Sequence, residues 1–123
     1  MSYIGDIIAE SLEDTSILKD VNIVSTRVEP VTEEHQTPWL TQWTLHTIDV
    51  ADGDAVSLAE RLSHALDRHQ NWYVDFKNSF THFVIFRDKV FRIDRRRKDE
   101  YRDMQAYGIA QGVPEYQLPD MEE

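Results

Sequence analysis

The chain contains no cysteine, and its 123 residues include only four glycines and four prolines. The absence of cysteine excludes disulfides, thiolate zinc sites and cysteine nucleophiles, and it fits a reducing cytoplasm. No apolar run approaches the roughly 20 residues that a membrane span needs. The first residues lack the basic and apolar segments of a secretory signal. We therefore expect a cytoplasmic protein with no membrane partner.

Basic residues are also scarce. Thirteen Lys and Arg face 23 Asp and Glu, so the formal net charge is −10. Such a surface repels phosphates and anionic lipids, which predicts no nucleic-acid partner. One basic run interrupts this pattern, Arg95–Lys98, with Arg92 close by and acidic residues at Asp94, Asp99 and Glu100. It is either a solvated, self-paired helix entry or an anion-binding patch, and we favour the first interpretation.

Hydrophobic periodicity predicts an α+β fold. Alternating, β-branched segments predict strands at 21–31, 39–50, 72–77, 80–86 and 90–94. Helical spacing predicts an N-terminal helix at 3–13, a central helix at 54–68 and a C-terminal helix at 97–107. Asp54 is the expected N-cap of the central helix, and Gly108 the expected stop of the last. The expected fold is a five-stranded, mainly antiparallel sheet, in β-β-α-β-β-β order, with the three helices packed on it.

The organisation is that of one domain. Residues 1–118 are expected to form it, and 119–123 an acidic C-terminal tail. The last three strands are joined by short turns and therefore predict a meander with apolar residues on both faces. A helix layer covers one face, and a second helix, the C-terminal coil or a partner subunit is needed for the other.

A pair of ionisable residues converges within this meander. If Asn78-Ser79 is a two-residue turn, Asp75 lies directly opposite His82 and on the same sheet face as Tyr73 and Lys77. A carboxylate that orients an imidazole is what a general base needs, and it is also an ordinary structural ion pair. A one-residue slip would send the two side chains to opposite faces.

Two further kinds of site can be sought in the sequence, an aromatic ligand pocket and a metal or nucleotide site. Trp43 and His46, on the strand at 39–50, either line a pocket for a flat ligand or belong to the core. Histidine spacing predicts no metal site, since His64 and His69 are five residues apart rather than four. The sequence also lacks a glycine-rich nucleotide motif, so we expect no cofactor.

Four blocks together resemble small uncharacterised prokaryotic proteins with no assigned activity. They are residues 38–46, residues 72–78, residues 82–86 with 89–91, and residues 107–108 with 112–117. The resemblance supplies no catalytic motif and implies only a prokaryotic cytoplasmic protein.

Three functional hypotheses follow from these patterns. The leading one is a small binding module that holds a small ligand or a protein partner on an aromatic-rich sheet face, with Tyr73, Lys77, Trp43 and His46 as binding residues. The second is an enzyme that uses Asp75 and His82 as its catalytic pair. The third is a structural subunit that forms a homodimer through its sheet.

Overall fold

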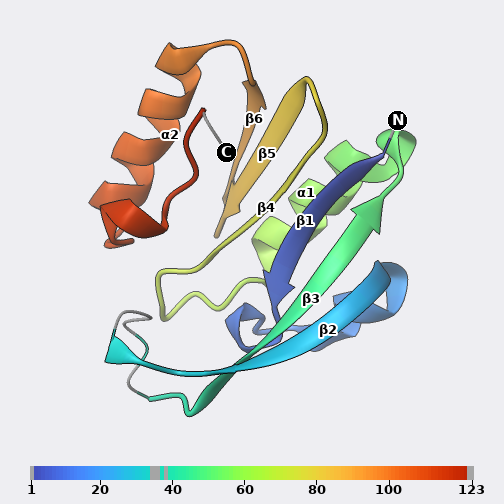
Figure 1. The fold of residues 1–123 in the computed structure, drawn as a ribbon, viewed down its shortest axis with the longest axis vertical. Coiled ribbons are helices and arrows are strands. Elements are labelled where there is room, and N and C mark those ends of the chain that lie inside the picture. The colour runs from blue at the N-terminus through green and yellow to red at the C-terminus, as the bar shows by residue number, and fades with distance from the viewer. Residues whose placement is uncertain (1, 34–36, 38, 122–123) are drawn as a thin grey trace.

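The computed structural model describes residues 2–33, 37 and 39–121. They form an antiparallel sheet of six strands in the order β2-β3-β1-β4-β5-β6 (Figure 1). The strands are β1 (Tyr3–Ile8), β2 (Asn22–Pro30), β3 (Gln42–Val50), β4 (Tyr73–Lys77), β5 (Thr81–Phe86) and β6 (Lys89–Asp94). The helices are α1 (Ala55–Ala65) and α2 (Lys98–Ala110), with short 3-10 turns η1 (Ala9–Ser11), η2 (Thr15–Asp20), η4 (Asp52–Asp54) and η5 (Glu115–Gln117). The predicted α+β class and antiparallel sheet are confirmed, but the sheet has six strands instead of five.

The sixth strand is the segment for which we predicted the N-terminal helix. Residues 3–8 form β1, which pairs with β3 on one side and β4 on the other. The isoleucines at 4, 7 and 8 fit one helical stripe, but β-branched side chains also favour a strand, and a glycine weakens a helix. As a strand, the segment buries Tyr3 and Ile7 on one sheet face, whereas Ile4 remains exposed on the other.

Both faces of the sheet carry apolar residues, but they are covered unequally. α1 covers the first face, where Leu62 and Ala59 pack in one cluster with residues of β1, β3, β4 and β5. On the second face, α2 and the C-terminal segment pack on Val84, Phe86 and Ile93, beside β5 and β6 (Figure 1). Among the described residues, none from β1, β2 or β3 joins that second cluster. We call the second face of these three strands the open half of the sheet.

The meander forms as predicted, with both turns displaced. Lys77 pairs with His82, so the first turn has four residues, and Asp75 lies opposite Val84 instead of His82. The Asn78 side chain explains the longer turn, because its Oδ1 accepts hydrogen bonds from the backbone N–H groups of residues 80 and 81. The second turn is the two-residue Arg87-Asp88, because β6 begins at Lys89 and not at residue 90 as predicted. Asp88 has φ +60°, a left-handed conformation that Asp tolerates in tight turns.

The two long helices differ from expectation at their ends. α1 ends at Ala65 rather than near 68, and Asp54 occupies its N-cap position without making a side-chain capping bond. α2 continues through Gly108, the predicted stop, because Gly112 ends the turn instead, with φ +97°. Gly108 packs closely against Leu118, where a Cβ would lie 2.7 Å from that side chain.

The C-terminal segment packs back on the second face. Leu118 is buried, and the carbonyl of Pro119 accepts a 3.0 Å hydrogen bond from Gln105 of α2. Of the predicted acidic tail, residues 122 and 123 lie outside the described part of the chain. Residues 34–36 and 38 of the predicted polar connection before β3 also lie outside it.

Candidate functional site

A pocket of about 380 Å³ lies where the open half of the sheet meets the covered half. β1, β3 and β4 contribute its sheet residues, and η5 contributes Tyr116 and Gln117. This volume falls within the range of small-molecule sites, which are usually concave, mostly apolar and furnished with a few polar groups. The position follows from the fold: α2 and the C-terminal segment stop short of β1, which leaves a step above the sheet.

Two carboxylates line this pocket, Asp6 of β1 and Asp75 of β4. The two residues are direct partners in the β1–β4 register, so their Cβ atoms lie on the same face about 4.5–5.5 Å apart. Oδ1 of Asp6 accepts a 2.8 Å hydrogen bond from the Thr47 hydroxyl. Like charges directly opposite one another destabilise a sheet. The arrangement therefore has a cost that packing alone does not explain.

Asp75 is held from behind by a buried chain of hydrogen bonds. Its Oδ2 lies 2.7 Å from Nε2 of His82, and Nδ1 of His82 lies 2.9 Å from the hydroxyl of Tyr101 on α2. A carboxylate only accepts, so Nε2 carries the proton, and in the neutral ring Nδ1 accepts from Tyr101. His82 is 0% exposed, whereas the Asp75 side chain is 27% exposed and reaches the pocket. The chain fixes the Asp75 carboxylate between the core and the pocket.

Aromatic rings form much of the remaining wall. Trp43, Trp72, Tyr73 and Tyr116 all line the pocket, together with the apolar side chains of Ile8 and Leu45. Trp43 and Trp72 meet edge to face with ring centroids 5.6 Å apart, and the Tyr73 hydroxyl donates to the carbonyl of Gln117. These contacts hold Trp43, Trp72 and Tyr73 in place in the pocket wall.

The Trp72 indole adds an unusual feature. Its side chain is more than nine-tenths buried, and its Nε1 has no hydrogen-bond partner among the described residues. Leaving a buried donor unsatisfied costs about 1–3 kcal/mol. Trp72 lines both the pocket and a smaller hollow of about 60 Å³ beside it. Trp72, which borders both spaces, thus carries a buried N–H donor without an acceptor.

The structure brings some of the predicted site residues together and separates others. Asp75 and His82 meet as predicted, because the turn shifted by two residues and so kept both on one face. Tyr73 and Trp43 line the pocket with Asp75. Lys77 shares their face but does not line the pocket.

His46 points away from this site. It is the register partner of Ile7, which is buried on the α1 side, and its Nδ1 lies 2.8 Å from the Thr26 hydroxyl. Asp6, Tyr101 and Tyr116 were not predicted as site residues. Asp6 was assigned to the predicted N-terminal helix. Tyr101 and Tyr116 lie on segments whose packing against the sheet cannot be inferred from the neighbouring sequence. The pairing of strand aspartates across β1 and β4 becomes visible only once β1 is recognised as a strand.

A larger groove of about 740 Å³ lies between the start of β2, the end of β3 and the start of α1. Its wall is polar, and no aromatic residue is among its described lining residues. Arg61, the basic residue there, is bound by Asp20 at 2.6 Å. A polar groove of this kind offers little apolar surface to a ligand.

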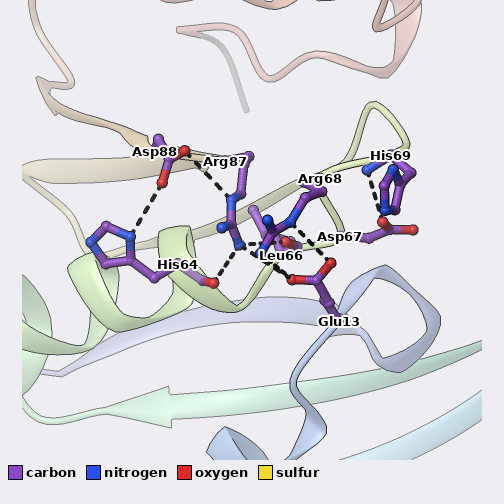
Figure 2. A network of polar contacts seen from close by, with 8 residues as sticks. All are labelled: Glu13, His64, Leu66, Asp67, Arg68, His69, Arg87 and Asp88. Carbon is purple, nitrogen blue, oxygen red and sulfur yellow. Dashed lines mark hydrogen bonds and ion pairs between the residues drawn. The ribbon is translucent and has the colours of Figure 1, made fainter.

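A second polar cluster lies at the opposite end of α1 (Figure 2). Ligand-type atoms of Glu13, Asp67 and His69 lie within 4.8 Å of one another, which is close enough for a metal ion. However, Arg68 binds both oxygens of Glu13, at 3.2 and 3.0 Å, and the hydrogen bond to Glu13 raises the pKa of Arg68. Arg87 lies 3.9 Å from the same carboxylate.

These contacts give the cluster a structural role. Arg87 donates to the carbonyls of His64 and Leu66 at the end of α1 (Figure 2). The backbone N–H of Glu13 donates to the carbonyl of Ala65 at 2.7 Å. The cluster therefore ties the loop after β1 to α1 and to the β5–β6 turn. The Glu13 carboxylate is already paired with the guanidinium groups of Arg68 and Arg87, which opposes cation binding there.

The basic run before α2 is largely matched within itself. Arg96 binds Asp94 at 3.1 Å and Arg97 binds Asp99 at 2.9 Å. Hydrogen bonds from these guanidinium groups lower the pKa values of Asp94 and Asp99. Arg95 instead donates to the carbonyl of Asn78 at 2.7 Å and so ties the run to the first turn of the meander. The geometry is that of a self-paired helix entry.

The comparisons with known proteins add no family: no family model, curated protein or solved structure matches the chain. Among the described residues, no helix is both long enough and apolar enough to cross a membrane. The function must therefore be argued from the site itself.

Proposed function

We propose that the protein is a small cytoplasmic binding module that holds a low-molecular-weight ligand in the pocket between the open and covered halves of its sheet. One observation carries this proposal. The pocket of about 380 Å³ combines aromatic and aliphatic walls with two carboxylates on adjacent strands, one of them fixed by a buried hydrogen-bond chain. Apolar walls supply affinity, and a few fixed polar groups supply orientation, which is the usual composition of a ligand site.

A thermal-shift screen against a broad metabolite library tests the proposal. A ligand at 100 times its dissociation constant stabilises the folded state by about 2.7 kcal/mol, which raises the Tm of a domain of this size on the order of 10 °C. The expected result is at least one stabilising compound.

A matched pair of variants tests whether any such compound binds in the pocket. Tyr116 is 64% exposed and lines the pocket, whereas Phe80 is 62% exposed and does not. Tyr116→Ala should remove the stabilisation by the compound, and Phe80→Ala should retain it. A screen without a stabilising compound, or a compound whose effect is the same in both variants, would count against the pocket.

The second candidate is an enzyme in which Asp75 meets the ligand. The observation in its favour is that Asp75 lines the pocket while His82 and Tyr101 support it from behind. His82 itself has no exposed surface and both ring nitrogens are engaged, so it positions Asp75 rather than receiving a proton from a ligand. Incubating each pocket ligand with the protein and following its NMR spectrum tests this candidate. Conversion that Asp75→Asn abolishes would support it, and an unchanged ligand would contradict it.

A further inference from the structure

The charge of the pocket is one-sided. Asp6 and Asp75 contribute two carboxylates, and no Lys, Arg or His is among the described residues that line it. Each carboxylate has one oxygen engaged, by Thr47 and by His82 respectively, and within the described part of the chain the other oxygen of each group accepts no hydrogen bond. Two acceptors on neighbouring strands thus remain available on the pocket side. An anionic ligand would be repelled here, and a neutral one would leave the charges unbalanced.

The walls favour the same kind of ligand. Four aromatic side chains, Trp43, Trp72, Tyr73 and Tyr116, line the same pocket as the carboxylates. The faces of aromatic rings attract cations, most strongly for Trp, and cages of such rings recognise ammonium groups. Carboxylates alone would serve equally for a hydrated metal ion, but such an ion gains nothing from apolar walls. The combination therefore selects an organic cation over an inorganic one.

The buried Trp72 N–H is an independent indication that a ligand completes this site. The residue is more than nine-tenths buried in the pocket wall, and its donor has no partner among the described residues. The nitrogen itself has almost no exposed surface, so an acceptor on a bound ligand would satisfy it only after the surrounding wall shifts. A ligand that matched the polar groups of the pocket would place a cation at Asp6 and Asp75 and a hydrogen-bond acceptor toward Trp72.

We infer that the pocket binds a small organic cation, an ammonium or guanidinium group on a compact body that also carries a hydrogen-bond acceptor. This inference rests on the proposed function, since it names the ligand class of the same pocket. The cation lies between Asp6 and Asp75, where it relieves the repulsion between two like charges in register. Lys77, the basic residue on the same face of β4, is not among the described residues that line the pocket.

Isothermal titration calorimetry with three probes of one shape and different charge tests the inference. The probes are L-phenylalaninamide, 3-phenylpropanamide and 3-phenylpropanoate, which carry charges of about +1, 0 and −1 at pH 6, where the α-amino group of the first is protonated. The first two also carry a carbonyl acceptor. We expect the cation to bind at least about tenfold more tightly than the neutral amide, and the anion to bind most weakly. The preference should decrease as salt is added, because screening weakens charge interactions at a partly exposed site.

Variants identify the residues responsible. Asp6→Asn and Asp75→Asn should each weaken cation binding about fivefold or more while changing binding of the neutral amide little. Asp103→Asn, which removes an exposed carboxylate from α2, is the matched control and should leave all affinities unchanged. Trp72→Phe, which keeps a ring and removes the N–H, should weaken the two amides and not the carbonyl-free amine phenethylamine. Thermal unfolding of each variant checks that it folds.

The results separate this inference from the proposed function. If the neutral or anionic probe binds as tightly as the cation, and Tyr116→Ala abolishes that binding, the pocket is a ligand site but the cation preference is wrong. If the metabolite screen finds only neutral or anionic pocket ligands, the same conclusion holds. If no compound of any charge binds in the pocket, both proposals fail together.

Discussion

The two halves of the sheet differ in how they are covered, and this difference explains where the site lies. In the half formed by β4, β5 and β6, the central strand β5 is buried from His82 to Phe86 between α1 on one face and α2 on the other. In the half formed by β2, β3 and β1, the edge strand β2 is exposed along almost its whole length. A ligand site needs both fixed groups and access. The boundary at β1 and β4 offers both, since Asp75 is anchored in the covered half and Asp6 stands on the open one.

The largest expected effect tests the layer beneath α1 that the two halves share. Phe83 and Leu62 are both buried in that layer. Phe83→Ala and Leu62→Ala should each lower the free energy of unfolding by about 3–4 kcal/mol, through lost burial and the cavity left behind. Phe80→Ala, an exposed aromatic close by, should change it by less than about 0.5 kcal/mol. Chemical denaturation measures all three, and a cost below about 1 kcal/mol at either core site would show that this layer is not the shared interior.

Two isoleucines on the second face compare the halves directly. Ile93 of β6 is 1% exposed beneath α2, and Ile4 of β1 is 48% exposed on the open half. Ile93→Ala should cost about 3 kcal/mol because a cavity forms. Ile4→Ala should cost less than about 0.5 kcal/mol, as expected at a surface position. Equal costs in urea unfolding would mean that something covers the open half in solution, as the homodimer hypothesis requires, and light scattering would then identify it.

Gly5 tests the seam between the halves. A Cβ at this position would lie 2.0 Å from the carbonyl oxygen of Asp75 and 2.6 Å from Cα of Phe76, both on β4. Gly5→Ala should therefore force β1 away from β4 and destabilise the protein by about 2–3 kcal/mol, in the range of other overpacked sites. Ligand binding should weaken as well, since Asp6 and Asp75 lie next along the same pairing. Gly53→Ala, at a glycine with nothing within 4 Å of a built Cβ, is the control. An unchanged stability of Gly5→Ala would contradict the close approach of the two strands.

The smallest expected effect concerns the ion pairs before α2, in the covered half. The pKa values of Asp94 and Asp99 are lowered by hydrogen bonds from Arg96 and Arg97. A carboxyl group whose pKa is lowered in the folded state contributes stability above its unfolded pKa, near 3.9 for Asp, and loses it as the pH falls through the folded value. Asp94→Asn should thus lower Tm slightly at pH 7, and the difference from the wild type should vanish in strong acid. Arg96→Gln should reproduce this profile, whereas a Tm difference independent of pH would exclude the ion pair as its cause.

The sequence predicts the local parts of this fold well and the non-local parts poorly. The meander and the two long helices follow from periodicity within one segment, and they are present. The helix predicted where β1 lies was wrong because three isoleucines fit both a helical stripe and a strand. Only pairing with β3 and β4 decides between the two structures. The Asp75–His82 contact survived a wrong turn length because sheet faces alternate with a period of two. Asp6 and Tyr116 were missed because their partners come from distant segments.

The position of β1 also governs how the chain can assemble. β1 lies near the middle of the sheet, yet it precedes both of its neighbours along the chain. Ile7 can pair only after His46 has been synthesised, and Ile4 can pair with β4 only after Lys77 has been synthesised. Contacts between residues so far apart in sequence slow folding, because loop closure must precede the stabilisation it allows. During synthesis the open edges of β1 are available for wrong partners until β4 has emerged. Formation of the proposed binding site and the joining of the two halves of the sheet therefore occur together, because the pairing of β1 with β4 achieves both.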